Sequence, residues 1–154
     1  MEITKTKTLT DSQFQQINRL WNEAYPENFK DRFGLLLDGV LNYNHYLIEG
    51  KNNTVLAWAV DFKKDNEVRF SIIVTESQKG KGFGGQLMNR LKNEHDVFFG
   101  WVIDHGDDKK LNGENYISPL SFYLKQGGEV LPNIRLDTEI VKAVKIKFIG
   151  KQNK

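Results

Sequence analysis

The chain has 154 residues, of which 39% are hydrophobic and 12% aromatic, and its formal net charge is +2. This length fits a single domain over residues 1–154 with a proper hydrophobic core, and the apolar content excludes an intrinsically disordered chain. The small net charge excludes a polycation of the kind that binds nucleic acid, and the absence of cysteine excludes a disulfide framework, a cysteine nucleophile and a thiolate-held metal.

The first forty or so residues predict one strand and two helices. Residues 3–8 can form the strand. Thr10 and Gln13 then have the spacing of a capping box, and apolar residues follow at helical intervals until Tyr25, where the next residue, a proline, ends the helix. A second set of apolar residues at helical spacing, over residues 33–41, predicts another helix.

The middle of the chain predicts three strands joined by short turns. Residues 45–49 and 54–62 are separated by Gly-Lys-Asn-Asn, which is a hairpin signal. A polar turn over residues 63–67 leads into a third strand over residues 68–74. These early strands are therefore expected to be connected as hairpins.

A glycine-rich segment links the last of these strands to a helix and a buried strand. Residues 77–87 read Ser-Gln-Lys-Gly-Lys-Gly-Phe-Gly-Gly-Gln-Leu, and Phe83, Leu87 and Leu91 lie one helical turn apart. Residues 97–103 are apolar apart from one glycine, which is typical of a strand covered on both faces. The order of strand, glycine-rich turn, helix and buried strand predicts a parallel crossover.

The last third of the chain predicts a loop, a short helix and two strands. Residues 107–115 are mostly polar and form the loop. Ser118 and Pro119 have the order of an N-cap and a proline at the first helical position, and a double glycine ends the helix. Strands over residues 130–136 and 141–149 close the domain.

This order of elements, β-α-α-β-β-β-α-β-α-β-β, predicts the fold class. We expect an α/β (α+β) domain with a mixed, mostly antiparallel, twisted sheet of about seven strands and helices on both faces.

The glycine-rich segment allows a dinucleotide-binding interpretation. From Gly80 onward it matches G-x-G-x-x-G, and Asp104 lies about 20 residues further on. In a dinucleotide-binding unit, however, the first glycine follows the strand almost directly, and further strand–helix units come after it. Here residues 75–79 intervene, and only 49 residues follow His105. A P-loop is disfavoured because Lys81 is followed by glycine. Dinucleotide binding stays a minor alternative. Taken alone, the segment fits an ordinary glycine- and lysine-rich surface loop about as well as a functional one, and its position between a buried strand and a helix favours the functional interpretation.

Taken as a whole, the segment resembles the coenzyme A pyrophosphate loop of the GNAT-type N-acetyltransferases. The family pattern is Arg/Gln-x-x-Gly-x-Gly/Ala, and Lys79-x-x-Gly82-x-Gly84 fits it with lysine in the first place. In such a loop, backbone N–H groups and a helix N-terminus bind the pyrophosphate, and glycine keeps side chains away from it.

A second patch supports the resemblance. Tyr123 and Gly127 have the spacing of the family's Tyr-x-x-x-Gly-Phe ending, while Gly128 replaces the phenylalanine. This departure is expected to leave the start of the next strand less anchored. The order of elements also agrees with the family over most of the chain.

The resemblance implies a GNAT-like sheet that is splayed between its fourth and fifth strands, residues 68–74 and 97–103. Acetyl-CoA would lie in this wedge as the acyl donor, with no metal. Its pantetheine amides would pair with the free edge of the fourth strand, and backbone N–H groups there would polarise the thioester carbonyl. The expected coenzyme-binding residues are Ile72, Ile73, Val74, Lys79, Gly80, Lys81, Gly82, Phe83, Gly84 and Gly85.

The resemblance also implies direct attack by an amine in a ternary complex. Tyr123 is the expected general acid for the departing thiolate, although packing against the sheet is an alternative role for it. Asp104 and His105 follow the buried strand and are candidate bases, since histidine titrates in the right range. Glu67 is a weaker candidate, and a water relay without any single base is the alternative.

Three aromatic residues are candidates for the acceptor pocket, although aromatic side chains more often lie in the core. They are Trp58, Trp101 and Tyr116.

The expected function is therefore transfer of an acetyl group from acetyl-CoA to a primary amine of a small molecule or peptide. A non-catalytic acyl-CoA sensor on the same fold is the main alternative. The start of the chain lacks the apolar core of a signal peptide, and no apolar run reaches membrane length, so we expect a cytoplasmic protein without nucleic-acid or membrane partners. The amine acceptor and the oligomeric state stay open, and a homodimer is one option.

Overall fold

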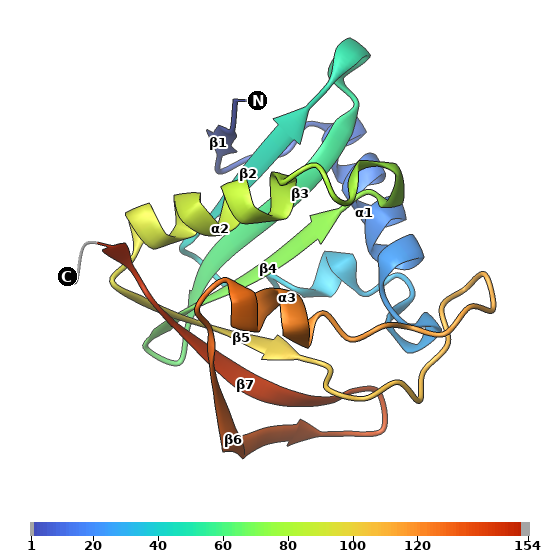
Figure 1. The fold of residues 1–154 in the computed structure, drawn as a ribbon. Coiled ribbons are helices and arrows are strands. Elements are labelled where there is room, and N and C mark those ends of the chain that lie inside the picture. The colour runs from blue at the N-terminus through green and yellow to red at the C-terminus, as the bar shows by residue number, and fades with distance from the viewer. Residues whose placement is uncertain (1, 152–154) are drawn as a thin grey trace.

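A seven-stranded sheet forms the centre of the computed structural model, which describes residues 2–151 (Figure 1). The strands lie in the order β1-β2-β3-β4-β5-β7-β6, and every neighbouring pair is antiparallel except β4 and β5. This confirms the predicted mixed, mostly antiparallel sheet. The strands are β1 Thr4–Thr6, β2 Tyr43–Glu49, β3 Val55–Lys64, β4 Glu67–Val74, β5 Val97–Val102, β6 Glu129–Asp137 and β7 Lys142–Ile149.

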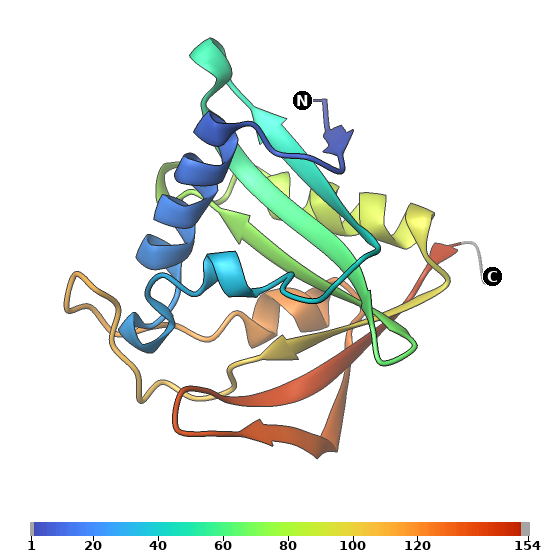
Figure 2. The same cartoon turned by 180° about the vertical axis from the view of Figure 1, so that it is seen from behind.

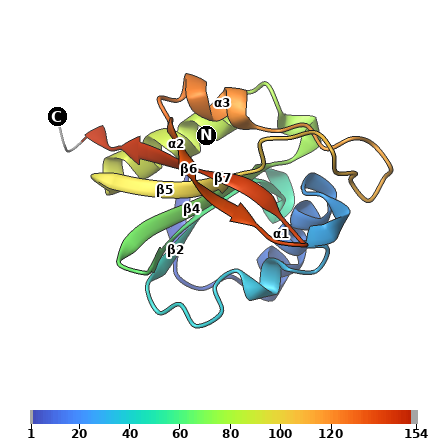
Figure 3. The ribbon, with the colours of Figure 1, turned by 90° about the horizontal axis from the view of Figure 1, so that it is seen from below.

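Helices cover both faces of the sheet, as predicted. Helix α1 (Asp11–Ala24) lies on one face, and α2 (Phe83–Glu94) and α3 (Leu120–Lys125) lie on the other (Figures 2 and 3). The capping box of α1 is present: the Gln13 N–H donates to Thr10 Oγ1 at 3.1 Å, and the Thr10 N–H donates to Gln13 Oε1 at 2.9 Å. None of the helices within residues 2–151 is long and apolar enough to cross a membrane.

The predicted second helix over residues 33–41 is wrong. Over this range the chain forms a 3₁₀ turn, η2 (Phe33–Leu35), and another 3₁₀ turn, η1 (Glu27–Phe29), precedes it. Asp31, just before this range, has φ of 61°, and Gly39, within it, has φ of 75°, so a right-handed helix is interrupted at both positions. The apolar spacing still places Phe33 in the core, edge-on to Trp58 with ring centroids 5.4 Å apart. Two further 3₁₀ turns, η3 (Lys51–Asn53) and η4 (Glu76–Gln78), lie in the β2–β3 and β4–α2 connections.

The parallel pair β4 and β5 separates soon after it begins. Only Arg69 and Phe99 are paired in register, and beyond them the strands diverge (Figure 1). Phe70 fills the point of divergence, where a Cβ on Gly100 would lie 2.7 Å from the Phe70 ring. Glycine at position 100 therefore lets the ring pack inside the wedge, and the splay between the fourth and fifth strands is confirmed.

A buried polar cluster ties the end of α2 to the sheet. Asp61 in β3 is 3% exposed and accepts hydrogen bonds from Tyr46 at 2.5 Å and Asn44 at 3.2 Å, while the His95 ring lies 2.7 Å away. Burial alone would raise the pKa of Asp61, but hydrogen bonds from His95 and Tyr46 outweigh it, so the net pKa is lowered. The cluster satisfies its buried carboxylate and needs no ligand.

His45 on the opposite face predicts an acid-sensitive stability. Its ring is 3% exposed and accepts the Trp58 indole N–H at Nδ1 over 3.0 Å, and burial lowers its pKa to about 4. Between about pH 6.5 and pH 4 the unfolded histidine binds a proton that the folded one does not, so folding is favoured above this window and weakened as pH falls through it. We expect urea unfolding to show a loss of about 1–3 kcal/mol from pH 7 to pH 4 that His45→Gln lacks.

The comparison with His45→Gln cancels the acid titration of the carboxylates, because both proteins share them. Equal pH dependence in the two proteins would contradict this role for His45.

Candidate active site

The loop between β4 and α2 has the backbone conformation of an anion site. Gly80 and Gly82 both have φ of 83°, a left-handed conformation that side chains disfavour, and a Cβ at either would meet no atom within 4 Å. Gly82 is the N-cap of α2 and provides no side-chain cap. The N–H groups of Phe83 and Gly84 in the first turn have no acceptor among residues 2–151. An open helix N-terminus with left-handed glycines before it can bind a phosphate through its backbone.

Gly84, Lys79 and Lys81 of the same loop differ in their contacts. Gly84 is needed for packing, because a Cβ there would lie 3.0 Å from the Phe122 ring of α3. Lys79 is paired with Glu76 at 3.0 Å and is half-exposed, so it would have to exchange this partner for a phosphate. Lys81 is exposed and has no ion pair within the described chain.

The edge of β4 that faces the wedge carries free backbone groups. Thr75 donates its N–H to the Leu56 carbonyl of β3 at 3.0 Å. Because N–H directions alternate along a strand, the N–H of Ile73 also points to β3, whereas those of Ile72 and Val74 point into the wedge. Of the three predicted residues of this strand, Ile72 and Val74 can therefore pair with a ligand, and Ile73 cannot without breaking the sheet.

Tyr123 comes to the wedge from α3. Ser118 Oγ accepts the Leu120 N–H at 3.2 Å and donates to the Ile103 carbonyl at 2.5 Å, so it ties the start of α3 to the residue that follows β5. The N-cap itself is Pro119, so the predicted N-cap at Ser118 is wrong by one residue. The helix begins at Leu120, one residue later than the predicted proline position. The Tyr123 ring packs against Phe70 in the wedge, with centroids 5.7 Å apart.

Gly128, where the family pattern has phenylalanine, also has a packing reason. A Cβ there would lie 2.6 Å from Ile146 and 2.8 Å from Phe148, both in β7. The side chains of β7 fill the space that a residue at position 128 would need. Glycine at this position therefore has a packing reason, and the expectation that it weakens the start of the next strand stays a prediction.

Two further tyrosines, Tyr25 and Tyr116, lie close enough to Tyr123 to influence its pKa. Burial raises the pKa of Tyr123, and Tyr25 and Tyr116 raise it further by their proximity; burial also raises the pKa of Tyr116, again with a contribution from Tyr25. Tyr25 hydrogen-bonds Ser71 of β4 at 3.0 Å. The hydroxyls of Tyr116 and Tyr123 have no hydrogen-bond partner among residues 2–151.

The sequence singled out Tyr116 and Tyr123 as candidates, and it did not single out Tyr25. The Tyr25-Pro26 pair was interpreted only as the end of a helix. No neighbouring residue in the sequence indicates that the Tyr25 hydroxyl reaches β4. A tyrosine instead of an apolar residue at the last turn of an amphipathic helix was the only available signal.

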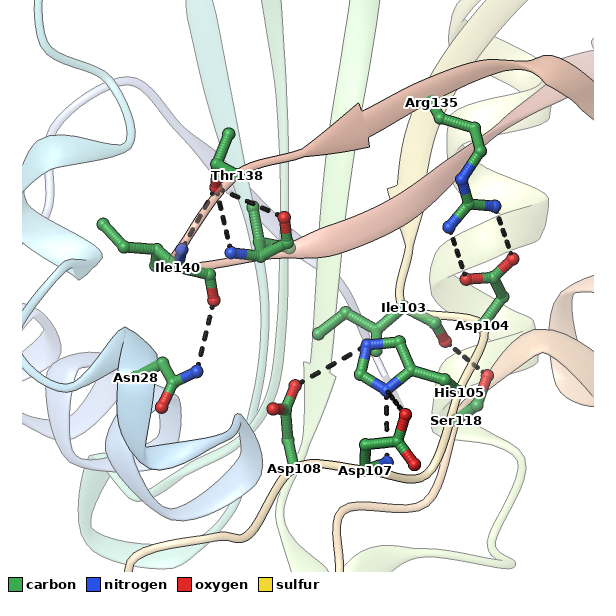
Figure 4. A network of polar contacts seen from close by, with 11 residues as sticks. Asn28, Ile103, Asp104, His105, Asp107, Asp108, Ser118, Arg135, Thr138 and Ile140 are labelled. Carbon is green, nitrogen blue, oxygen red and sulfur yellow. Dashed lines mark hydrogen bonds and ion pairs between the residues drawn. The ribbon is translucent and has the colours of Figure 1, made fainter.

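The two candidate bases are held in other interactions (Figure 4). Asp104 binds Arg135 of β6 through two contacts of 2.8 and 3.2 Å, and the Arg135 guanidinium lowers its pKa. The Nδ1 atom of His105 accepts the Asp107 N–H at 3.1 Å, and its Nε2 lies 3.8 Å from Asp108. A neutral His105 therefore carries its proton on Nε2, and its Nδ1 lone pair is occupied by the Asp107 N–H. This geometry favours structural roles for both residues and leaves the water relay as the better account.

Two other candidates also belong to the scaffold. Trp58 is completely buried beneath α1, so its predicted place in the acceptor pocket is wrong: the pattern of β3 turns it toward the core. Glu67 is bound by Arg69 and Lys145, both at 2.8 Å. Trp101 is half-buried and packs near Tyr116, which keeps both as acceptor-pocket proposals.

A hollow of about 320 Å³ opens beside the end of β4, between α1 and the 110–114 loop. Val74 and Thr75 line it together with the carboxylates Glu23, Glu76 and Glu114. Lys110 is the counter-charge among the described lining residues. No group of His, Asp and Glu within residues 2–151 is arranged to hold a metal ion.

No protein-family model matches the chain, and no curated protein matches its sequence. Solved structures match it over nearly its whole length. The aminoglycoside 6'-N-acetyltransferase from Enterococcus faecium is 14% identical with a TM-score of 0.67, covering 97% of each chain. ElaA from Escherichia coli is 16% identical with a TM-score of 0.60, over 96% of this chain and 99% of that one.

A third match is the spermidine N-acetyltransferase from Vibrio cholerae in complex with CoA and spermine, at 12% identity and a TM-score of 0.61, over 98% of this chain and 97% of the other. The protein therefore has the fold of the GNAT-type N-acetyltransferases, and the predicted resemblance is confirmed at the level of the fold.

Proposed function

We propose that the protein is an N-acetyltransferase that moves an acetyl group from acetyl-CoA to a primary amine. One observation carries this proposal: the parting of β4 from β5 joins a free strand edge, an open helix N-terminus and a tyrosine hydroxyl in one wedge. An elongated ligand with a pyrophosphate at one end, amides in the middle and a thioester at the other matches these three features in order.

In the proposed mechanism the loop and the N-terminus of α2 bind the pyrophosphate, and Ile72 and Val74 pair with the pantetheine amides and the thioester carbonyl. The amine nitrogen attacks the acetyl carbon, the N–C bond forms, and the C–S bond breaks with its electron pair on sulfur. Burial raises the pKa of Tyr123 above that of an ordinary phenol, so its hydroxyl is protonated at neutral pH and can hydrogen-bond, and donate, to the developing thiolate. The attacking amine releases one proton to water. Water then returns a proton to the Tyr123 oxygen.

The acceptor is proposed to be a small-molecule or peptide amine. Structures with this fold include enzymes named for spermidine and for aminoglycosides. The carboxylates Glu23, Glu76 and Glu114 around the hollow beside β4 would attract an amine in its cationic form before it loses its proton.

Thermal unfolding with acetyl-CoA, and separately with NAD, tests the proposal. A ligand at roughly 100 times its Kd should stabilise the protein by about 2.7 kcal/mol. Stabilisation by acetyl-CoA alone supports the coenzyme site, and stabilisation by NAD alone would replace it with the dinucleotide interpretation. Thiol release from acetyl-CoA with a panel of spermine, an aminoglycoside and a tripeptide with a free α-amine then separates an enzyme from a sensor.

A further inference from the structure

Tyr25 is held rigidly at the end of α1. As the C-cap, it has φ of −94° and ψ of 165°, the extended conformation favoured before a proline, and its N–H donates to the Trp21 carbonyl. Its ring lies edge-on to Trp21 at 4.6 Å and tilted against Phe29 at 5.6 Å. The following residues are tied to the 109–110 loop, where the Glu27 N–H donates to the Lys109 carbonyl at 2.8 Å. The aromatic packing and the backbone together leave the hydroxyl little freedom to move.

This rigid ring points its hydroxyl at the divergence of the sheet. The hydroxyl lies 3.0 Å from Ser71 Oγ, two residues beyond the last register pair of β4 with β5. Phe70 and Ile72 pack toward α2 and α3, so Ser71 between them points to the α1 face. Tyr123 reaches the wedge from the opposite face. Tyr25 and Tyr123 therefore approach the same opening from its two sides.

Packing alone requires neither the hydroxyl of Tyr25 nor that of Ser71. Phenylalanine at position 25 would keep the aromatic contacts and bury no polar group. One hydrogen bond between Tyr25 and Ser71 also leaves acceptor lone pairs on both oxygens unused. Burial raises the pKa of Tyr25, with the Ser71 bond acting against it, so at neutral pH the hydroxyl stays protonated and serves as a hydrogen-bonding group and not as a base.

The attacking amine needs acceptors of this kind. A neutral primary amine attacks through its lone pair, and that lone pair points at the acetyl carbon only when the N–H bonds are held elsewhere. We propose that the Tyr25 hydroxyl, fixed by Ser71, accepts an N–H of the amine and aims its lone pair at the thioester carried by the wedge. This inference rests on the proposed acetyl transfer and adds an acceptor-side residue to it. The N–C bond forms and the C–S bond breaks as above, and the proton of the amine leaves to water.

Tyr25→Phe tests the assignment, with the amine of the panel that gives the fastest thiol release as the probe. We expect kcat/KM for this amine to fall about tenfold, the scale of one lost hydrogen bond. The thermal shift given by acetyl-CoA should stay at the wild-type value, because Tyr25 lies on the acceptor side. Ser71→Ala should act in the same direction, and the double variant should be little worse than Tyr25→Phe alone, since the two hydroxyls act as one unit.

Tyr43→Phe is the matched control, because it removes a hydroxyl from a half-buried tyrosine at the start of β2, away from the wedge. Unchanged kcat/KM for the amine in Tyr25→Phe would overturn the inference while leaving the proposed function intact. A loss of acetyl-CoA binding equal to the loss of activity would also overturn it, since that would indicate a structural role. If wild-type protein binds acetyl-CoA but releases no thiol with any amine, the proposed function fails, and the role of Tyr25 fails with it.

Discussion

Tyr123→Phe is expected to slow the acetyl-transfer step by roughly 10²–10⁴-fold, the usual scale for losing a general acid. The change removes only the hydroxyl. The ring keeps its contacts with Phe70 at 5.7 Å and Phe148 at 6.1 Å, so the wedge retains its shape. Affinity for acetyl-CoA should barely change, because in the proposed mechanism the hydroxyl serves the sulfur and not the phosphates or amides. Single-turnover thiol release, measured with saturating acetyl-CoA, gives the chemical step directly.

The thiolate is a good leaving group and needs limited help, so a loss of only about tenfold would still fit a minor role as a donor. Tyr43→Phe again controls for the removal of a hydroxyl. Turnover at the wild-type rate, with chemistry shown to be rate-limiting, would reduce Tyr123 to a packing residue and would remove the proposed acid from the mechanism.

Gly82→Asp is expected to abolish detectable acetyl-CoA binding. Gly82 is the N-cap of α2 with φ of 83°, and the space beside it is open to the position proposed for the pyrophosphate. An aspartate there adds bulk and places a negative charge about 4–5 Å from a dianion, which corresponds to several kcal/mol at the effective dielectric of a protein surface. Titration followed by thermal shift or calorimetry measures the change.

Two variants separate the contributions to this effect. Gly82→Asn adds similar bulk without the charge and tolerates the left-handed conformation better than most residues, so it should weaken binding by a smaller factor. Gly39→Asp introduces the same side chain at φ of 75°, also with no atom within 4 Å of its Cβ, but in the connection before β2. It should cost similar stability and leave binding intact. If Gly82→Asp folds and binds acetyl-CoA normally, the loop is not the pyrophosphate site.

Local signals in the sequence predicted the elements that lead to the site. The capping box at Thr10 and the glycines before Phe83 each act within a few residues, so their spacing is enough to place a helix start. The Ser118-Pro119 pair placed the start of α3 only to within one residue. Strand patterns gave the seven strands and the parallel crossover for the same reason. The helix expected over residues 33–41 failed because apolar spacing reports which side chains face the core, and it does not report the backbone angles of Asp31 and Gly39.

What the sequence determined by itself is the order of elements, the mixed sheet and the position of the glycine loop and Tyr123, all of which follow from short-range patterns. The tertiary structure alone decided which distant residues share the wedge. It brings Tyr25 to Ser71 across 46 positions and Arg135 to Asp104 across 31, and it buries Trp58 beneath α1. Contacts between residues this far apart in the sequence depend on the splay of two strands and on which face of the sheet each helix covers. Local sequence propensities do not encode either feature.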